Sequence, residues 1–318
     1  MAIVTPLSDE QLRLLVNLRA RYEAWMQPQQ KLFELPYDLR IKTVDKKKYL
    51  YEIYDRGGNG RSLGRVKPQL QRQYDAYQQT KSELKARMET MRPVLAESAA
   101  MYRALRLPLL SSDAGPILRE CDKRGLLGSH LYVVGTNAIA AYMAEAGSTV
   151  TLADETEDFD LAWVAREEQD AGAAVWHMLK AVDSTFTVNT ERDFQARNAK
   201  AYEVELLVAP SRELTLPPND RPRPVSLPEQ EWLLLGRPVD QVIGCRDGSP
   251  ARIVAPDPRY FALHKLWMAE QDKRNPLKRI KDRKQGLALL DLIRQAMPHF
   301  ALDEEFSAAL PAELGKFI

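Results

Sequence analysis

Cysteine, histidine and long apolar runs are scarce in this chain of 318 residues. Its two cysteines, Cys121 and Cys245, form neither a ligand cluster nor a disulfide framework, which is typical of proteins kept in a reducing compartment. No apolar run approaches the ~20 residues that a membrane helix needs, and the first residues lack a basic segment followed by an apolar one. We therefore expect a cytoplasmic protein with no membrane partner.

Several common catalytic patterns are also missing. The four histidines are scattered without the spacing of a zinc site. The chain contains no Gly-x-Ser-x-Gly elbow and no Walker-type Gly-Lys-Ser/Thr string. His130 enters a buried strand, and we expect it to be a core residue. These absences argue against zinc, α/β-hydrolase and P-loop chemistry.

The overall composition is ordinary, but the charges are unevenly distributed. With 45% hydrophobic and 28% charged residues, the chain resembles a soluble globular protein of about two domains. Residues 40–106 hold 16 Lys/Arg and 7 Asp/Glu, residues 150–206 hold 5 and 13, and residues 259–284 hold 9 and 3. An acidic centre between basic flanks suits metal-binding carboxylates beside surfaces that meet phosphates, although solvated helix faces would give the same pattern.

The stretch from Leu131 to Leu161 carries the strongest signal. It predicts a strand, a turn at Gly135, a helix that opens at Asn137, and a second strand with Asp158 and Asp160. Residues i and i+2 of a strand project from one face, about 6.6 Å apart along the chain. The two carboxylates therefore point the same way, and such a pair can bind a divalent cation through oxygen.

The turn before the helix favours an anion. Gly135 allows the backbone to approach a ligand closely, and the free N–H groups at a helix start attract phosphate. A phosphate site beside paired metal carboxylates suggests phosphoryl or nucleotidyl transfer.

Gly135-Thr136, a helix and Asp158-Phe159-Asp160 together resemble the signature of the DNA polymerase β-type nucleotidyltransferase fold. The strings VVGTNAIAAY and TEDFDLAW also resemble bacterial nucleotidyltransferase-fold proteins. The family pattern requires a third acidic residue on a later strand, for which AYEVELLVAP offers Glu205, with Glu203 as the alternative. The gap between Gly135 and Asp158 is longer than usual, and we expect an inserted strand, GSTVTLADE, to fill it.

The resemblance implies a two-metal mechanism, in which an NTP donates NMP to an acceptor hydroxyl. Asp158 and Asp160 would bridge two Mg²⁺ (or Mn²⁺) ions, and Glu205 would hold the second ion and accept the proton of the acceptor. The triphosphate would rest against Gly135, Thr136 and Asn137.

The C-terminal segment resembles the helical part of small bacterial nucleotidyltransferases. By that comparison Lys265 would meet a nucleotide phosphate, although a surface lysine is an equal alternative. Lys281 and Asp282 would face the cleft.

We expect an α+β fold, with a small mixed β-sheet nucleotidyltransferase core between an N-terminal helical and hairpin region and a C-terminal helical region. The corresponding segments are residues 1–110, 111–211 and 212–318. The pattern predicts a helix after Ser8 that ends before Pro28, and a helix from Pro68 that is interrupted at Pro93. In the C-terminal segment, Trp232–Leu235 and Arg252–Val254 read as strands, followed by two helices broken near Pro276.

A basic hairpin suggests the kind of acceptor. Tyr49 and Tyr51 alternate along a strand between Lys46–Lys48 and further arginines, a combination that can bind a nucleic-acid backbone and stack bases. RNA, tRNA included, or a protein is the expected acceptor, and a hairpin that simply docks on the helices is the alternative. An inactive, antitoxin-like binding module on the same fold also stays open, as do the choice of NTP and the oligomeric state.

Overall fold

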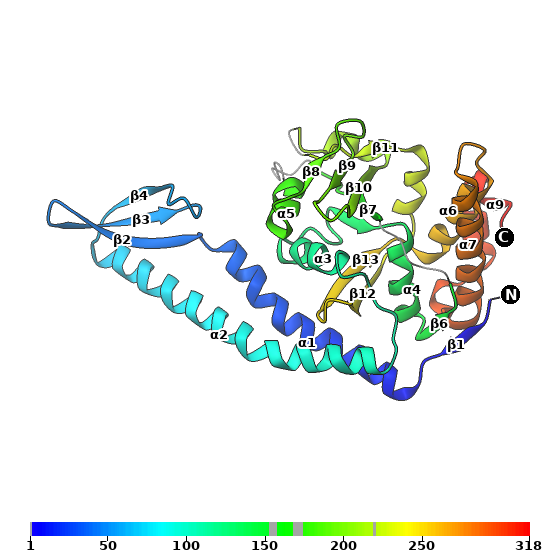
Figure 1. The fold of residues 1–318 in the computed structure, drawn as a ribbon, viewed down its shortest axis with the longest axis horizontal. Helices are drawn as coiled ribbons and strands as arrows, with labels where there is room; N and C mark the ends of the chain where they lie inside the picture. Colours follow the sequence, from blue (N-terminus) through cyan, green and yellow to red (C-terminus); the bar gives the residue numbers. More distant parts are fainter. Residues whose placement is uncertain (1, 153–157, 168–173, 219–220) are drawn as a thin grey trace.

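A computed structural model describes residues 2–152, 158–167, 174–218 and 221–318 and confirms the α+β class. Figure 1 shows a mixed body from which a long arm projects. The elements are, in chain order, β1 (Val4–Pro6), α1 (Asp9–Glu34), β2 (Asp38–Val44), β3 (Lys47–Ile53), β4 (Gly60–Arg65), α2 (Pro68–Ala104), α3 (Ala114–Lys123), β5 (Leu131–Val133), η1 (Thr136–Ala138), α4 (Ile139–Glu145), β6 (Ser148–Val150), β7 (Asp158–Trp163), α5 (Ala174–Val182), β8 (Thr187–Val188), β9 (Gln195–Arg197), β10 (Glu203–Val208), η2 (Pro210–Thr215), β11 (Val225–Ser226), η3 (Pro228–Leu234), β12 (Val239–Gly244), β13 (Pro250–Ala255), α6 (Pro258–Glu270), α7 (Pro276–Ala296), η4 (Pro298–Phe300), α8 (Glu304–Ala308) and α9 (Ala312–Gly315).

The main sheet of the body is mixed, as predicted. Its strand order is β5-β7-β10-β9-β8, and β11 pairs with the end of β10. Strands β7 and β10 are parallel, whereas β5 and β9 run antiparallel to their neighbours. Phe159 and Leu161 on β7 and Val204 on β10 are buried, because alternate side chains of each strand face the core. The opposite face of these strands is therefore available for a site.

The C-terminal helices cover one side of this available face. Helices α6 and α7 pack against each other, and η3 packs on α6. Leu263 on α6 and Leu289 on α7 are fully buried in the same hydrophobic core as the strands of the main sheet. Gly286 allows the two helices to approach closely, since a Cβ at this position would lie 2.7 Å from Leu266 Cγ. The predicted break near Pro276 is confirmed.

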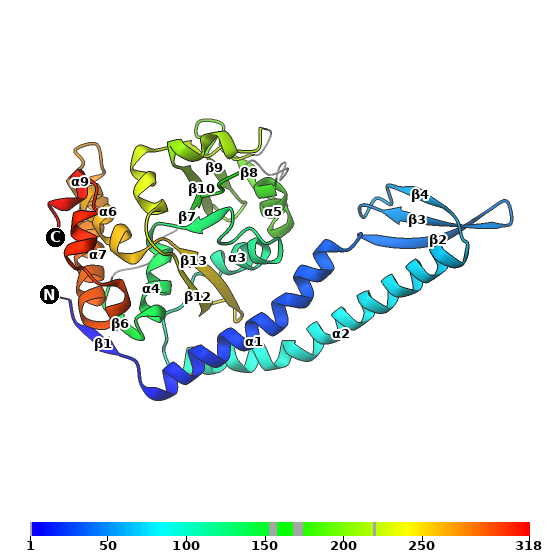
Figure 2. The ribbon, with the colours of Figure 1, turned by 180° about the vertical axis from the view of Figure 1, so that it is seen from behind.

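Helices α1 and α2 run side by side and form the arm, which carries the sheet β2-β3-β4 at its far end (Figures 1 and 2). We call this sheet the arm sheet. Leu39 and Leu50 of the arm sheet form a small core with Tyr77 of α2, separate from the core of the body. At the other end of the arm, Leu18 of α1 and Tyr102 of α2 belong to the body core. The arm thus has a base that is integral to the body and a far end with its own packing.

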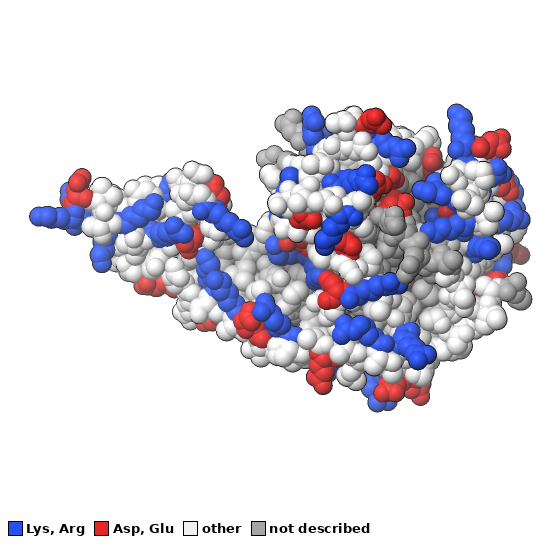
Figure 3. All heavy atoms as spheres, viewed as in Figure 1, with Lys and Arg blue, Asp and Glu red and all other residues white. Residues whose placement is uncertain are grey.

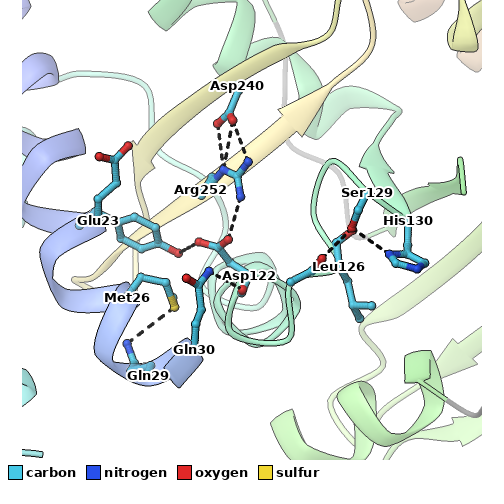
Figure 4. Close-up of polar contacts among 12 residues, drawn as sticks. Glu23, Met26, Gln29, Gln30, Asp122, Leu126, Ser129, His130, Asp240 and Arg252 are labelled. Carbon is cyan, nitrogen blue, oxygen red and sulfur yellow. Dashed lines mark hydrogen bonds and ion pairs between the residues drawn. The ribbon is translucent and has the colours of Figure 1, made fainter. Parts of the chain in front are cut away.

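A network of charged and polar side chains fixes the base of the arm (Figure 4). The Tyr22 hydroxyl of α1 donates to Asp122 of α3 at 2.9 Å. Arg252 of β13 binds the other oxygen of Asp122 at 2.9 Å and also contacts Asp240 of β12 at 2.8 Å. Gln30 donates to the Asp122 carbonyl. Because one buried carboxylate joins α1, α3 and β13, the arm leaves the body in a defined direction.

Two expected helix breaks at prolines are wrong. Helix α1 continues through Pro28 to Glu34, and α2 is continuous through Pro93. The Arg21 Nη1–Ser98 Oγ contact of 2.5 Å sets the antiparallel register of the two helices, and it places Pro28 and Pro93 at nearly the same level. Packing between the helices compensates for the hydrogen bond that each proline removes.

Other local expectations also needed correction. Residues Trp232–Leu235 are not a strand: Pro228–Leu234 forms a 3-10 helix, and β12 is the partner of β13. The inserted strand exists as β6, but it pairs with β1 at the N-terminus and not with the main sheet. Residues 153–155 of that insert lie outside the described residues.

His130 is buried beside the Trp163 ring, with Nδ1 2.8 Å from Ser129 Oγ, as expected for a core residue. Within the described ranges, no helix combines the length and the apolar composition needed to cross a lipid bilayer.

Candidate active site

Four carboxylates lie side by side at the start of two neighbouring parallel strands. In the β7–β10 register, Asp158 pairs with Glu203 and Asp160 pairs with Glu205. All four project from the face opposite to Phe159 and Val204, which are fully buried. The parallel register therefore brings Glu205, from a distant part of the chain, next to the Asp-x-Asp pair. Glu203 shares the same face, so the register alone does not choose between the two glutamates.

Gly135 lies directly against Asp160. Strand β5 runs antiparallel to β7, so the residues that follow β5 lie beside the residues at the start of β7. The Val134 N–H donates to the Asp160 carbonyl at 3.0 Å. Gly135 has φ +68°, and a Cβ at this position would lie 1.9 Å from Asp160 Oδ2. Only glycine permits both this conformation and this approach.

The two residues after Gly135 support the site in different ways. They belong to the 3-10 turn η1, and α4 follows only from Ile139, so the regular helix begins two residues later than expected. Gln285 Nε2 of α7 lies 3.4 Å from the Thr136 hydroxyl. The Asn137 amide donates to the Asp158 carbonyl at 3.2 Å. Asn137 thus holds the start of β7 in place.

A cavity of about 560 Å³ separates the carboxylates from the C-terminal helices. Gly135, Thr136 and the four carboxylates line one wall, and residues of η3, α6 and α7 line the other. The second wall contains cationic side chains (Lys265, Arg274, Lys278 and Lys281), apolar ones (Leu227, Leu233, Phe261 and Met268), two carboxylates (Glu229 and Asp282) and the uncharged Gln230 and His264. The cavity is large enough for a nucleotide-sized ligand.

The carboxylates carry more negative charge than the surrounding residues compensate. Burial, together with the charges of Asp158 and Glu205, raises the pKa of Asp160 to about 7, and the nearby Lys265 and Lys278 oppose this rise only in part. Burial and then the charge of Asp158 also raise the pKa of Glu205. Because burial and like charge disfavour the ionised forms of Asp160 and Glu205, a cationic ligand beside them would be stabilising.

Lys265 lies in the cavity wall but already has a carboxylate partner. Its Nζ is 2.9 Å from Asp282 Oδ1, and both side chains are buried. Arg274 binds the second oxygen of Asp282 at 2.8 Å. Asp282 therefore positions two cations beside the cavity. Lys281 lines the cavity too, as expected, while contact of Lys265 with a phosphate stays a prediction.

Three residues that contact the carboxylates were not predicted from the sequence, and one of them is Arg197, whose Nε lies 3.7 Å from Glu203 Oε1. Lys278 Nζ lies 3.5 Å from Asp158 Oδ2, and Gln195 of β9 donates to both Glu203 and Glu205 at 3.0 Å. Lys278 precedes Lys281 by three positions and Asp282 by four, so helical periodicity could have placed it on the same face. Gln195 left no such signal, because β9 has only three residues.

The family model described as Nucleotidyltransferase matches residues 112–311, which is more than half of the chain. The chain belongs to this nucleotidyltransferase family. Membership confirms the resemblance seen in the sequence and assigns nucleotidyl transfer as the general activity. In two further comparisons, no curated protein and no solved structure matched the chain. The match begins after α2, so the arm lies outside the region that defines the family.

The four carboxylates are ligands that suit a hard divalent cation, but their side chains are not arranged around a common ion position. Within the described ranges, no group of three Asp, Glu, His or Cys side chains is placed to hold an ion. Asp158 contacts Lys278, and Glu205 accepts from Gln195. The carboxylates nevertheless offer only oxygen ligands on one face of the sheet, as Mg²⁺ prefers, and a cation would offset the like charge that helps to raise the pKa values of Asp160 and Glu205. Binding requires these side chains to release their present partners.

Proposed function

We propose that the chain transfers NMP from an NTP to the hydroxyl of a macromolecular acceptor, RNA or protein, in a Mg²⁺-dependent reaction. The observation that carries the proposal is the β7–β10 register, which aligns Asp160 with Glu205 beside Gly135 in a nucleotide-sized cavity.

In the reaction, the acceptor hydroxyl oxygen forms a bond to the α-phosphorus, and the bond from that phosphorus to the bridging oxygen of pyrophosphate breaks. Glu205 accepts the hydroxyl proton, and its raised pKa makes it a stronger base than an ordinary glutamate. Lys265, Arg274 and Lys281 supply positive charge along the path of the triphosphate. In phosphoryl transfer the protein takes little part in the covalent chemistry, so the positioning of the reactants and the neutralisation of their charge determine the rate.

Asp158, Asp160 and Glu205 would hold the divalent ions, with Glu203 as the alternative third ligand. When bound, such ions polarise phosphoryl oxygens and stabilise the charge on the attacking and leaving oxygens. Mn²⁺ is expected to replace Mg²⁺, because both accept oxygen ligands in octahedral geometry.

The position of the arm supports a large acceptor. At 1.5 Å per residue, the 37 residues of α2 span about 55 Å, and the arm sheet lies at the far end. The alternative function is an inactive, antitoxin-like binding module. The four carboxylates are intact and lie in register beside Gly135. This favours an enzyme, because their mutual repulsion would destabilise a module that only binds a partner and would bring it no benefit.

Labelling with each α-³²P NTP, in the presence of Mg²⁺ and total cell extract, tests the proposal. We expect a labelled macromolecule with the wild-type protein and at least a hundredfold less label with Asp158→Asn or Asp160→Asn. Glu205→Gln and Glu203→Gln tell the two candidate third carboxylates apart, since only the true ligand should cause a comparable loss.

Glu213→Gln serves as the matched control, because Glu213 is an exposed carboxylate that does not line the cavity. Nuclease and protease treatments then identify the class of the acceptor. Equal labelling by the wild type and both aspartate variants would refute the site, and no labelling with any NTP would favour the binding module.

A further inference from the structure

The outer face of the arm sheet combines aromatic and basic side chains in two rows. Lys42, Tyr49 and Arg65 are direct neighbours across the three strands, and so are Arg40 and Tyr51. By the alternation of β3, both tyrosines lie on the side opposite to Leu50, which packs in the small core of the arm. Each row thus presents one tyrosine ring next to cationic side chains.

These side chains are accessible. Arg40, Lys42 and Arg65 are exposed, and the two tyrosines are half-buried. Lys42 Nζ lies 4.8 Å from the centre of the Tyr51 ring, so the ring is already part of a cationic surface. In Figure 3, basic side chains are spread over the sheet end of the arm.

The charge of the arm sheet is not neutralised from within. Residues 38–67 contain nine Lys/Arg and four Asp/Glu. Among the described residues, the ion pairs of these cations are Arg40–Asp38 and Arg61–Glu52, while the carboxylate of Asp55 accepts from Asn59. Seven cations are left without a carboxylate partner in the part of the chain that the structure describes, at a place far from the acidic site. A surface of this kind complements a polyanion.

We propose that the outer face of the arm sheet binds a single-stranded segment of the RNA whose hydroxyl is modified in the cavity. This inference rests on the proposed function and names the acceptor. Aromatic rings on a sheet stack on unpaired bases, while neighbouring cations contact the phosphates. Tyr49 and Tyr51 are about 6.6 Å apart along β3, so each ring can take one base. RNA fits better than duplex DNA, because its loops and ends expose unpaired bases.

An acidic protein or an anionic membrane would use the cations but would have no need of the tyrosine rings. The arm sheet also lies well away from β7 and β10, which carry the carboxylates (Figure 1), so a small molecule could not contact both places at once. The arm lies outside the family match, which fits a role in choosing the acceptor.

Fluorescence anisotropy of the full-length protein with a labelled, mixed-sequence single-stranded 30-mer RNA tests the proposal, without NTP or metal. We expect Lys42→Glu/Arg65→Glu to weaken binding at least tenfold, and to lower the slope of log Kd against log salt by roughly 1 or more. Tyr49→Ala/Tyr51→Ala should weaken binding at least fivefold, whereas Tyr49→Phe/Tyr51→Phe should bind within twofold of the wild type, because phenylalanine keeps the ring.

The matched control is Arg72→Glu/Lys85→Glu, which changes the net charge equally at two exposed positions of α2. It should alter binding less than twofold, and circular dichroism melting should show every variant folded. If both charge-reversed proteins lose the same RNA affinity, the effect depends on net charge alone, and the proposal is overturned. Tighter binding to a duplex DNA 30-mer of the same sequence, to polyglutamate or to phosphatidylserine vesicles than to RNA would also overturn the proposal.

The binding assay is independent of the chemistry. Asp160→Asn should bind RNA like the wild type, since it changes the cavity and not the arm. With active protein, the charge-reversed sheet variant should raise the KM for a long RNA and leave kcat unchanged. RNA binding at the arm sheet without any labelling of RNA would contradict transfer to RNA, and labelling of RNA without binding at the arm sheet would contradict the role of the arm sheet.

Discussion

At the scale of single residues, the site depends on one close approach. Gly135 leaves space for Asp160 Oδ2 where any Cβ would stand, and its φ of +68° is in the left-handed region. Asp160 in turn is partly buried, and this burial, together with the charges of Asp158 and Glu205, raises its pKa. The glycine and the aspartate therefore constrain each other, and each can be tested separately.

Gly135→Ala should inactivate the protein by displacing Asp160. The backbone conformation, with φ +68° and ψ −160°, is essentially confined to glycine, and it costs about 1–3 kcal/mol for a residue with a Cβ. Gly125→Ala is the matched control, because Gly125 has φ +69° and a Cβ there would meet no atom within 4 Å. We expect both variants to lose stability from backbone strain, with the larger loss in Gly135→Ala, where the Cβ also overlaps Asp160, and we expect loss of labelling only in Gly135→Ala. Full labelling by Gly135→Ala would show that the contact has no role.

Asp160→Asn should stabilise the metal-free protein at alkaline pH. The pKa of Asp160 is about 7 in the folded protein, against ~3.9 in an unfolded chain. Between these values the folded state keeps a proton that the unfolded state has lost, so the stability of the wild type falls as pH rises from about 4 to 7. The asparagine variant lacks this loss.

Urea denaturation in EDTA at about pH 4 and about pH 8 measures the difference. At each pH, the free energy of unfolding of the variant is compared with that of the wild type. This difference should be roughly 1–4 kcal/mol more in favour of the variant at the higher pH than at the lower one, at about 1.4 kcal/mol per pKa unit. A variant that loses stability relative to the wild type as pH rises would contradict the raised pKa.

At the scale of secondary-structure elements, the prolines show where local rules fail. The sequence predicted helix ends at Pro28 and Pro93, yet both helices continue because they pack against each other along the arm. The prediction was wrong because a partner helix outweighs the hydrogen bond that a proline removes.

Pro93→Ala should stabilise the protein, since Pro93 is exposed inside α2. The new N–H can donate within the helix, and the steric clash of the ring with the preceding turn is removed. The unfolded chain becomes more flexible, which offsets part of this effect, so we expect the free energy of unfolding to rise by about 1–3 kcal/mol. Pro68→Ala is the control. Pro68 occupies the first turn of α2, where its missing N–H costs nothing, and we expect no gain. Urea denaturation compares the two, and equal effects would show that α2 carries no strain at Pro93.

The sequence predicted the elements of the site better than the contacts between them. The positions of Asp158 and Asp160 on one strand and of Glu205 on another follow from side-chain alternation, which is a local property. The salt bridge from Lys278 and the amide of Gln195 depend on how α7 and β9 pack, which no local pattern specifies. The error at Trp232–Leu235 has the same origin, since an apolar run of that length fits either a strand or a 3-10 turn.

At the scale of the whole molecule, the chain separates chemistry from an extended surface. The family match covers the body and its cavity, whereas the arm precedes it in the sequence and projects away from it (Figure 2). The division into residues 1–110, 111–211 and 212–318 stays a prediction, but α1 and the end of α2 share the core of the body. The network around Asp122 fixes the direction of the arm, so an acceptor held there would meet the body in a constant geometry.

The central claim is that Asp158, Asp160 and Glu205 hold a divalent cation and a triphosphate beside Gly135. The most direct measurement is the crystal structure of the wild-type protein with Mn²⁺ and a non-hydrolysable NTP, with Mn²⁺ located by its anomalous scattering. The account predicts Mn²⁺ bound to Asp158 and Asp160, with Lys278 displaced from Asp158 and the phosphates against Gly135 and Thr136. Mn²⁺ and nucleotide bound elsewhere, with the Asp158–Lys278 contact intact, would contradict it.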